Sequence, residues 1–164
     1  MRSKSTRYSS LVTTQVTITY VLGFLFCANA EAVVLIRKMK PLWQQGLLNG
    51  IGGKIERGET SLEAMIREFQ EETGVNTTGC NWRSFCVMHG DNWEVTCFEA
   101  KNEDAWLSAK TTERESIEKL NLKSLDMSEC VSNLPWLLAL ALDENGGIPP
   151  FAIVQYPSTI TDLR

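Results

Sequence analysis

Residues 47–75 read LLNGIGGKIERGETSLEAMIREFQEETGV, and this stretch decides the fold. Its first part is a glycine-rich loop with short apolar pieces, and its second part predicts a helix over Ser61–Thr73. Thr60 and Glu63 have the spacing of a capping box, in which each side chain satisfies the backbone N–H of the other residue. Gly74 is the residue type that usually follows the last turn of a helix.

The predicted helix carries apolar and acidic residues on different arcs. At about 100° per residue, one arc holds four apolar side chains and predicts the face that packs on a sheet: Leu62, Met65, Ile66 and Phe69. A second arc holds three glutamates spaced i, i+3, i+4: Glu68, Glu71 and Glu72. Like charges at this spacing repel by roughly 0.2–0.5 kcal/mol per pair, unless a cation lies between them. Bound Mg²⁺, or Mn²⁺ in its place, is one interpretation of the glutamates, and a solvated acidic face is the other.

A longer pattern contains these glutamates. Gly53 is followed after five residues by Glu59, and after seven more by Arg67-Glu68-Phe69-Gln70-Glu71-Glu72-Thr73-Gly74-Val75. This segment resembles the complete 23-residue box of the Nudix hydrolase family. The resemblance implies an α/β protein with the Nudix fold, an α/β/α sandwich with a mixed β-sheet and a catalytic box helix. The order of the predicted elements resembles that fold over most of residues 16–156.

The resemblance also implies a role for individual residues of the box. The implied metal ligands are the carbonyl of Gly52 and the carboxylates of Glu68, Glu71 and Glu72. Either Glu71 or Glu72 is implied to polarise the attacking water. Arg67 is implied to pair with box glutamates and to hold one in position, with Glu59 as its expected partner. Lys54 is a candidate contact to a substrate phosphate, and the cations would orient a water for attack on phosphorus.

Further candidates lie beyond the box. Family members often recruit one more glutamate there, and the spacing to the following strand favours Glu115 over Glu113 as a catalytic residue. The alternative for both is a charged loop. His89, the single histidine, either lines the cleft or lies on the surface, which is the commoner place for a lone histidine.

The residues around the box give partial indications about the substrate. The segment Asn49–Lys54 is similar to that of MutT-type enzymes, which act on oxidised purine triphosphates, so Asn49 is expected to bind a base through its amide. Asn133 is expected either to contact the base or, by preference, to cap the following helix. Ser132 and Asn133 stand where some of these enzymes carry an acidic pair, and this departure leaves the identity of the base open.

The leading hypothesis is a Mg²⁺-dependent pyrophosphohydrolase that cleaves a nucleoside triphosphate, with oxidised purine nucleotides among its candidate substrates, to the monophosphate and pyrophosphate. The alternatives are a hydrolase of ADP-ribose or a related compound, and a nucleotide-binding sensor without activity. Residues 76–106 lack the proline of ADP-ribose hydrolases, and the tyrosine of dinucleoside polyphosphate hydrolases is absent too. Trp43 and Trp136 are candidates for stacking on the base, but we expect both to be buried in the interior.

Outside the box, local patterns predict further elements. Residues 17–26 and 32–37 are rich in β-branched and aromatic residues and predict a hairpin with a turn at residues 29–31. The alternative is a secretory signal peptide, because basic residues precede an apolar stretch and an A-x-A pattern that ends at Ala30. We favour the hairpin, since cleavage after Ala30 would remove half of it.

On the C-terminal side of the box, two or three strands are expected between Asn81 and Ala100. A short strand is expected from Ile117 to Leu125, and a second helix from Pro135 to about Asp143. Residues 39–46 predict a loop, and the segment from Gly146 to Arg164 is expected to be mostly irregular because of its prolines.

The composition limits the class of protein. The chain has 164 residues, 43% of them hydrophobic, and a formal net charge of −4, which fits one domain over residues 16–164 behind a flexible tail of residues 1–15. The acidic balance disfavours a nucleic-acid partner, and no apolar run is long enough to cross a membrane. Five scattered cysteines predict free thiols in a cytoplasmic protein, present as a monomer or homodimer.

Overall fold

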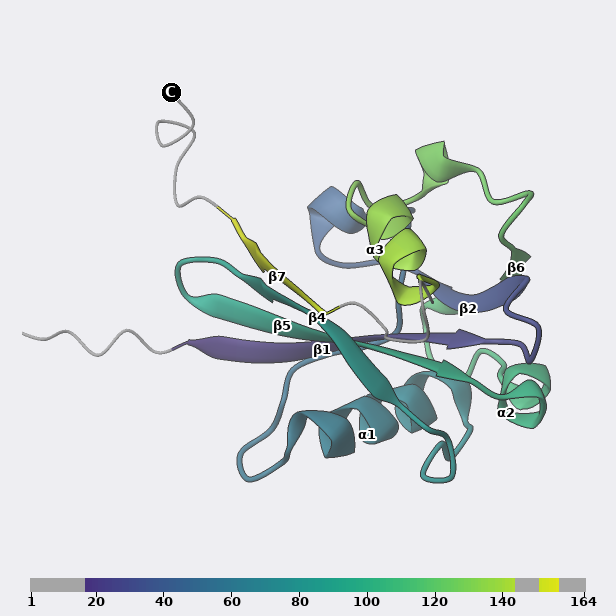
Figure 1. Cartoon of the computed structure of the whole chain (residues 1–164), viewed down its shortest axis with the longest axis horizontal. Helices are drawn as coiled ribbons and strands as arrows, with labels where there is room; N and C mark the ends of the chain where they lie inside the picture. Colours follow the sequence, from purple (N-terminus) through teal and green to yellow (C-terminus); the bar gives the residue numbers. More distant parts are fainter. Residues whose placement is uncertain (1–16, 144–150, 157–164) are drawn as a thin grey trace, which may run out of the picture.

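The computed structural model describes residues 17–143 and 151–156. These residues form a mixed seven-stranded sheet in the order β3-β2-β1-β5-β4-β7, with β6 also paired to β2 (Figure 1). The strands are β1 (Ile18–Phe26), β2 (Ala32–Arg37), β3 (Leu48–Asn49), β4 (Arg83–His89), β5 (Trp93–Lys101), β6 (Ser116–Asn121) and β7 (Ala152–Gln155). The helices are α1 (Ser61–Thr73), α2 (Glu103–Ser108) and α3 (Leu134–Ala141), with short 3₁₀ helices η1 (Leu42–Gln44) and η2 (Met127–Glu129). The predicted tail, residues 1–15, lies outside the described residues.

Strands β1 and β2 confirm the predicted N-terminal hairpin. They pair antiparallel with Leu25 opposite Val34, and Ala30 in the turn has a φ of 57°. On its other side β1 runs parallel to β5, with Ile18 opposite Trp93. The apolar stretch that resembles a signal peptide is therefore a central strand of the sheet, and most of it is buried.

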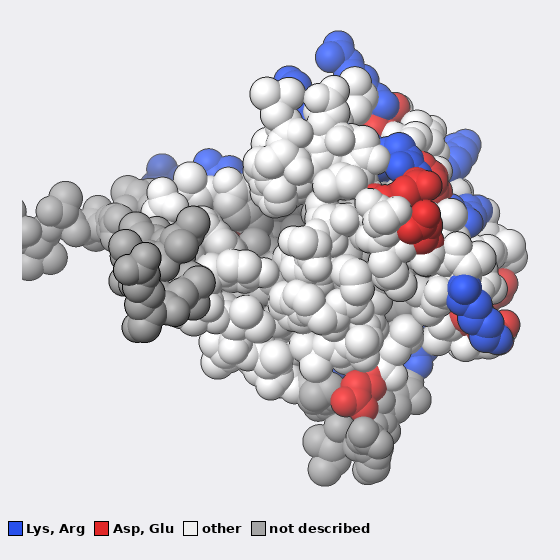
Figure 2. Space-filling model, turned by 90° about the horizontal axis from the view of Figure 1, so that it is seen from above, with Lys and Arg blue, Asp and Glu red and all other residues white. Residues whose placement is uncertain are grey.

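Helices cover both faces of the sheet, so the expected layered α/β architecture is confirmed (Figure 1). Helix α1 buries Met65 and Phe69 against one face, and α3 buries Leu134 and Leu137 against the other. Each such side chain stabilises the fold by roughly 1.5–3 kcal/mol. The sequence of α3 has no charged residue, and Figure 2 shows that this side of the molecule is largely uncharged except near its edge. In the described part of the chain, no helix has the length and apolar character needed to cross a membrane.

The box helix begins and ends where its sequence predicts. The hydroxyl of Thr60 accepts a hydrogen bond from the Glu63 N–H, and the Glu63 carboxylate accepts one from the Thr60 N–H, so the capping box is present. Gly74 ends the helix with a left-handed φ of 75°, which glycine adopts without a steric penalty.

The packing face of α1 is rotated from the predicted arc. Leu62 is 43% exposed, whereas Ala64, which was not expected in the core, is fully buried. The physical reason is that the helix turns Glu68 toward the Gly53 main chain and Glu72 toward Lys38 and Glu115. Both carboxylates are consequently half-buried, although the apolar pattern alone placed them on a separate solvent-facing arc.

Most other elements agree with the predictions, with shifts at their ends. Strands β4 and β5 lie in the expected span, and α3 begins one residue earlier than expected. Strand β6 covers Ser116–Asn121 rather than residues 117–125. Helix α2, capped by the Asn102 side chain, and strand β7, in a segment expected to be irregular, were not predicted. Strand β7 exists through its parallel pairing with β4, a contact distant in sequence that no local pattern reveals.

All five cysteines are free thiols, as predicted. Four of them are buried: Cys27, Cys86, Cys97 and Cys130.

Candidate active site

The glycine-rich loop lies directly on β1. The N–H of Val21 donates to the Gly53 carbonyl at 2.9 Å, and Gly23 and Ile51 exchange both backbone hydrogen bonds at 2.7 and 3.0 Å. A Cβ on Gly52 would lie 2.0 Å from the Val21 carbonyl oxygen, so only glycine allows this close approach. The loop thereby brings the main chain at Gly52, an expected metal ligand, and Gly53 close to the Glu68 carboxylate in the middle of the box helix.

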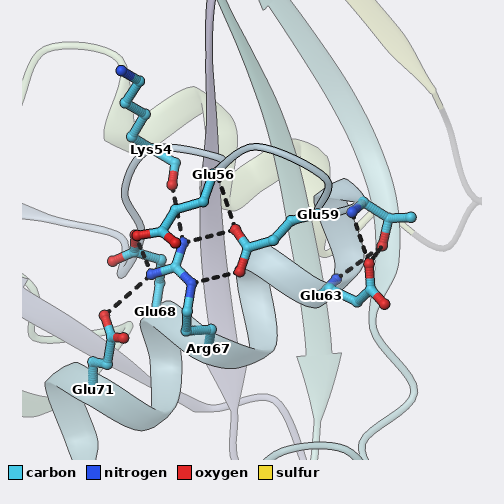
Figure 3. Close-up of polar contacts among 8 residues, drawn as sticks. Lys54, Glu56, Glu59, Glu63, Arg67, Glu68 and Glu71 are labelled. Carbon is cyan, nitrogen blue, oxygen red and sulfur yellow. Dashed lines mark hydrogen bonds and ion pairs between the residues drawn. The ribbon is translucent and has the colours of Figure 1, made fainter.

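Arg67 is the centre of a network that joins the loop to the helix (Figure 3). Its Nε and Nη2 donate to the two carboxylate oxygens of Glu59 at 2.7 and 3.0 Å, which confirms the expected pair. Nη1 donates to Glu68 at 2.9 Å and to Glu71 at 3.1 Å, and Nη2 also donates to the Lys54 carbonyl at 3.0 Å. A guanidinium has five N–H donors, and these five contacts use all of them. Arg67 therefore holds two of the three box glutamates in fixed positions.

The three box glutamates have different surroundings. The Glu71 side chain is 51% exposed, whereas that of Glu68 is only 14% exposed. Burial raises the pKa of the Glu68 carboxyl, although its ion pair with Arg67 opposes that effect. Burial is also the main reason that the pKa of Glu72 is raised to about 7. The charge of Lys38 lowers the pKa of Glu72, and the nearby carboxylates of Glu113, Glu115 and Glu68 raise it further.

Glu72 indicates that these residues fit a divalent cation. Its Oε2 is buried and has no hydrogen-bond partner among the described residues. A buried carboxylate oxygen without a partner is costly, and Mg²⁺ or Mn²⁺ is a hard ion that prefers such oxygens. As the side chains stand, the described residues contain no group of three or more His, Cys, Asp or Glu that encloses a metal position. A cation would therefore need to draw Glu68 and Glu71 partly away from Arg67.

A cavity of about 530 Å³ opens beside the loop. Its lining includes Gly52 and Gly53 of the glycine-rich loop, Met88 of β4 and Trp93 of β5. This volume is in the range of small-molecule sites. None of the described residues that line it is acidic, whereas four carry amides: Gln44, Asn49, Asn92 and Asn133.

Two of the three predicted substrate contacts line this cavity. The Asn49 Nδ2 donates to Gln44 Oε1 at 3.1 Å, and its Oδ1 accepts the Gly50 N–H at 2.8 Å. Asn133 is the N-cap residue of α3, as the preferred interpretation predicts, but its side chain makes no capping hydrogen bond, and its Nδ2 instead lies 3.7 Å from the sulfur of Met88. Lys54 is exposed and does not line the cavity, and Figure 3 shows its side chain extending away from Arg67.

The expectation that both candidate tryptophans are buried is wrong. Trp43 is 71% exposed and lines the cavity from η1, and Trp136 is 37% exposed on α3. Trp93, which sequence reasoning did not select, also lines the cavity and packs on Tyr156 with ring centroids 5.5 Å apart. The alternation of its strand does not predict which face of the sheet lines the cavity. Gln44 was missed too, although it lies in the loop whose proline and glycine content was recognised.

The two glutamates considered beyond the box differ in their contacts. Glu115 forms an ion pair with Lys38 and accepts hydrogen bonds from the Met39 and Lys40 backbone N–H groups. Burial by itself raises the pKa of Glu115, but Lys38 and the two amides outweigh burial and hold that pKa below its usual value. Glu113 is exposed. His89 lies at the end of β4, 3.3 Å from Glu94, and does not line the cavity.

Comparison with known proteins agrees with this architecture. A family model described as the NUDIX domain matches residues 18–136. A solved structure of MutT, from work on Aliivibrio salmonicida and Vibrio cholerae, is 20% identical with a TM-score of 0.60, over 77% of this chain and 97% of that one. The MutT protein of Bacillus halodurans is 17% identical with a TM-score of 0.66, over 88% and 92% of the two chains. The NUDIX domain of Shewanella oneidensis NrtR, complexed with ADP ribose, is 14% identical with a TM-score of 0.63, over 76% and 85%.

At these identities the solved structures establish the fold that the chains share. The match to the family model is stronger, because it spans well over half of the chain and includes the whole box, the Arg67 network and most of the cavity lining. The chain therefore belongs to the Nudix family and is a phosphoanhydride hydrolase.

Proposed function

We propose that this chain is a divalent-cation-dependent pyrophosphohydrolase that converts a nucleoside triphosphate to the monophosphate and pyrophosphate. The observation that carries the proposal is the mixed lining of one cavity. The same cavity is lined by Gly52 and Gly53, the latter against the Glu68 carboxylate, and by amide and aromatic side chains. A base bound against these side chains would direct its phosphates toward the glycine-rich loop and the acidic helix.

The residues of the Nudix box have different proposed roles in binding the metal ion and the phosphates. Glu68, Glu71 and Glu72 and the Gly52 carbonyl are the proposed ligands of Mg²⁺, for which Mn²⁺ can substitute. When bound, the cation would offset phosphate charge and lower the pKa of a bound water. Arg67 keeps Glu68 and Glu71 in place between turnovers. Glu71 or Glu72 would accept the proton of the attacking water. The water oxygen would bond to phosphorus as the phosphoanhydride bond breaks. The Lys54 ammonium would contact a phosphate.

The other end of the cavity would bind the base. Asn49 and Asn133 are the proposed contacts, because an amide offers both a donor and an acceptor to a base edge. Trp43 lines the cavity from the loop side and would stack on the ring of the base. Oxidised purine nucleotides remain candidate substrates, since the amide wall can satisfy either a donor or an acceptor on the base.

The test is the release of products from a panel of normal and oxidised nucleoside triphosphates, ADP-ribose and dinucleotides. Monophosphate and pyrophosphate should form from one or more triphosphates with Mg²⁺, and not with EDTA or with the Glu72→Gln protein. Reaction in H₂¹⁸O would show which phosphorus is attacked, because the label enters either the monophosphate or the pyrophosphate. No cleavage of any triphosphate would refute the proposal.

A second candidate, hydrolysis of ADP-ribose, is favoured by one observation: a structurally similar NUDIX domain, from NrtR, was solved in complex with ADP ribose. It would yield AMP and ribose 5-phosphate, which the same assay distinguishes from pyrophosphate release. Binding without cleavage would instead indicate a nucleotide sensor.

We also propose a cytoplasmic location, because the five cysteines are all free thiols, most of them buried. The assembly would be a monomer or a homodimer without a stable nucleic-acid partner, in keeping with the acidic net charge.

A further inference from the structure

One wall of the cavity comes from a loop with little support from the core. The loop joins β2 to β3, and five of its residues line the cavity: Lys38, Lys40, Pro41, Trp43 and Gln44. Its only helical turn, η1, has no buried residue, and Leu42 and Trp43 are 85% and 71% exposed. Apolar packing therefore contributes little to the position of this wall, and polar contacts have to fix it.

The base of the loop is closed by hydrogen bonds. Lys38 donates its N–H to the Leu47 carbonyl at 2.9 Å and accepts from the Gly46 N–H at 2.8 Å. The Arg37 Nη1 donates to the Gly46 carbonyl at 2.8 Å, and Arg37 is itself paired with Glu118. These contacts join the two ends of the loop, but they do not reach residues 39–44.

Glu115 supplies contacts to the first residues of the loop, which directly follow β2. Strands β2 and β6 pair antiparallel with Arg37 opposite Ser116, so the next residues outward, Lys38 and Glu115, lie beside each other. The Glu115 carboxylate binds the Lys38 ammonium and accepts the N–H groups of Met39 and Lys40. Its side chain is only 16% exposed, and a charge-assisted hydrogen bond at such a site is roughly twice as strong as a neutral one.

We infer that Glu115 is a positioning residue that anchors the loop of residues 38–46 and so fixes the wall of the cavity that receives the nucleotide. This inference rests on the proposed function, and it gives Glu115 a role different from acting on the phosphorus. The Glu115 carboxylate already binds three groups of the protein itself. All three belong to the loop that forms one wall of the cavity. Loss of Glu115 should therefore weaken nucleotide binding more than it slows the chemical step, although it also removes a charge close to Glu72.

The first test needs no substrate. Amide hydrogen exchange, read by mass spectrometry on peptides that cover residues 38–46, should be faster in Glu115→Ala than in the wild type by about 10-fold at Met39 and Lys40, whose N–H groups lose their acceptor. Glu115→Gln keeps an acceptor oxygen and should retain part of the protection. Glu113→Ala is the matched control, and its exchange in this loop should equal that of the wild type. Unchanged exchange in Glu115→Ala would overturn the inference.

The second test separates binding from chemistry. With the best triphosphate from the panel, Glu115→Ala should raise KM by about 10-fold and change kcat by less than about 3-fold, and Glu115→Gln should recover part of the KM. A fall in kcat of about 100-fold with KM unchanged would show that Glu115 is a catalytic residue and would overturn the inference. If the wild-type protein cleaves no triphosphate, the proposed function fails, whereas the exchange experiment still decides whether Glu115 anchors the loop.

Discussion

The carboxylate of Glu68 packs against the main chain of Gly53. A Cβ added to Gly53 would lie 2.3 Å from Oε1 and 2.5 Å from Oε2 of Glu68, well inside contact distance. The neighbouring Gly52 is equally crowded, but there the obstacle is the backbone carbonyl of Val21 on β1. Two adjacent glycines therefore serve different purposes: one lets the loop lie on the sheet, and the other leaves room for a proposed metal ligand.

This difference predicts that two alanine substitutions affect different properties, one the turnover and the other the stability of the fold. Gly53→Ala should keep the fold, since a flexible side chain can move aside, but it should displace Glu68 and lower turnover by about 100-fold. Gly52→Ala meets rigid backbone and should lower the free energy of unfolding by about 1–3 kcal/mol or more. Urea unfolding and steady-state turnover measure the two effects. Gly79→Ala, with no atom within 4 Å of the added Cβ, is the control. Equal effects of Gly52→Ala and Gly53→Ala on stability would contradict this prediction.

Arg67 offers a second prediction, because its planar fork makes five contacts at once. Arg67→Lys keeps the charge but cannot reach Glu59, Glu68 and Glu71 together, so kcat/KM should fall about 10- to 100-fold. Glu59→Gln keeps an acceptor for Arg67, and Glu59 neither lines the cavity nor contacts Glu68 or Glu71, since the other hydrogen bond of its carboxylate comes from the Glu56 N–H, so its effect should be smaller. The measurement is kcat/KM at saturating Mg²⁺, with circular dichroism to check the fold. Full activity in Arg67→Lys would mean that the network does not position the ligands.

Local signals predicted the parts of this protein that depend on neighbouring residues. The capping box at Thr60 and the glycine at position 74 define α1 correctly at both ends, and the Nudix pattern predicts the Arg67–Glu59 pair that the structure contains. Leu62 shows where this reasoning stopped. Its hydrophobicity predicts a place in the core, but the helix turns Glu68 and Glu72 inward instead. The periodicity of apolar residues cannot predict that carboxylates are buried.

The remaining differences come from tertiary structure. Trp43 was expected inside, as most tryptophans are, yet it lines a cavity from an exposed loop whose anchor, Glu115, is 77 residues away from Lys38. Strand β7 is defined by its partner β4, and the Asn133 side chain at the N-cap of α3 contacts Met88 of β4 rather than the helix backbone. The site as a whole joins segments that no local window contains.

The exposed position of Trp43 leads to a third prediction. Trp43→Ala should raise KM for a triphosphate by about 10- to 100-fold, because stacking of a base on an aromatic ring contributes roughly 1–3 kcal/mol. Stability should change by less than about 0.5 kcal/mol, since the side chain is mostly in water. Trp43→Phe should recover much of the affinity. Trp136→Ala, which alters a tryptophan outside the cavity, should leave KM unchanged; equal KM values for Trp43→Ala and the wild type would exclude stacking on Trp43.

Glu72 predicts a pH dependence of stability in the absence of divalent cations. Burial raises the pKa of its carboxyl to about 7, above the ordinary value of 4.5. Between these two pH values the folded protein holds a proton that the unfolded chain has released. The free energy of unfolding should therefore fall as pH rises through this window, and the full cost should be present above pH 7.

Glu72→Gln removes this titration and tests both the electrostatics and the metal role. In EDTA, the stability of the variant relative to the wild type should increase from pH 5 to pH 8, as read by urea unfolding. Added Mg²⁺ should then stabilise the wild type, by about 2.7 kcal/mol at 100 times its Kd, and stabilise the variant much less. Glu71→Gln, which alters a half-exposed proposed ligand, should likewise be stabilised by Mg²⁺ less than the wild type. If Mg²⁺ stabilises Glu72→Gln as much as the wild type, the buried oxygen of Glu72 is not a ligand, and the remaining proposed ligands, Gly52, Glu68 and Glu71, must hold the cation without it.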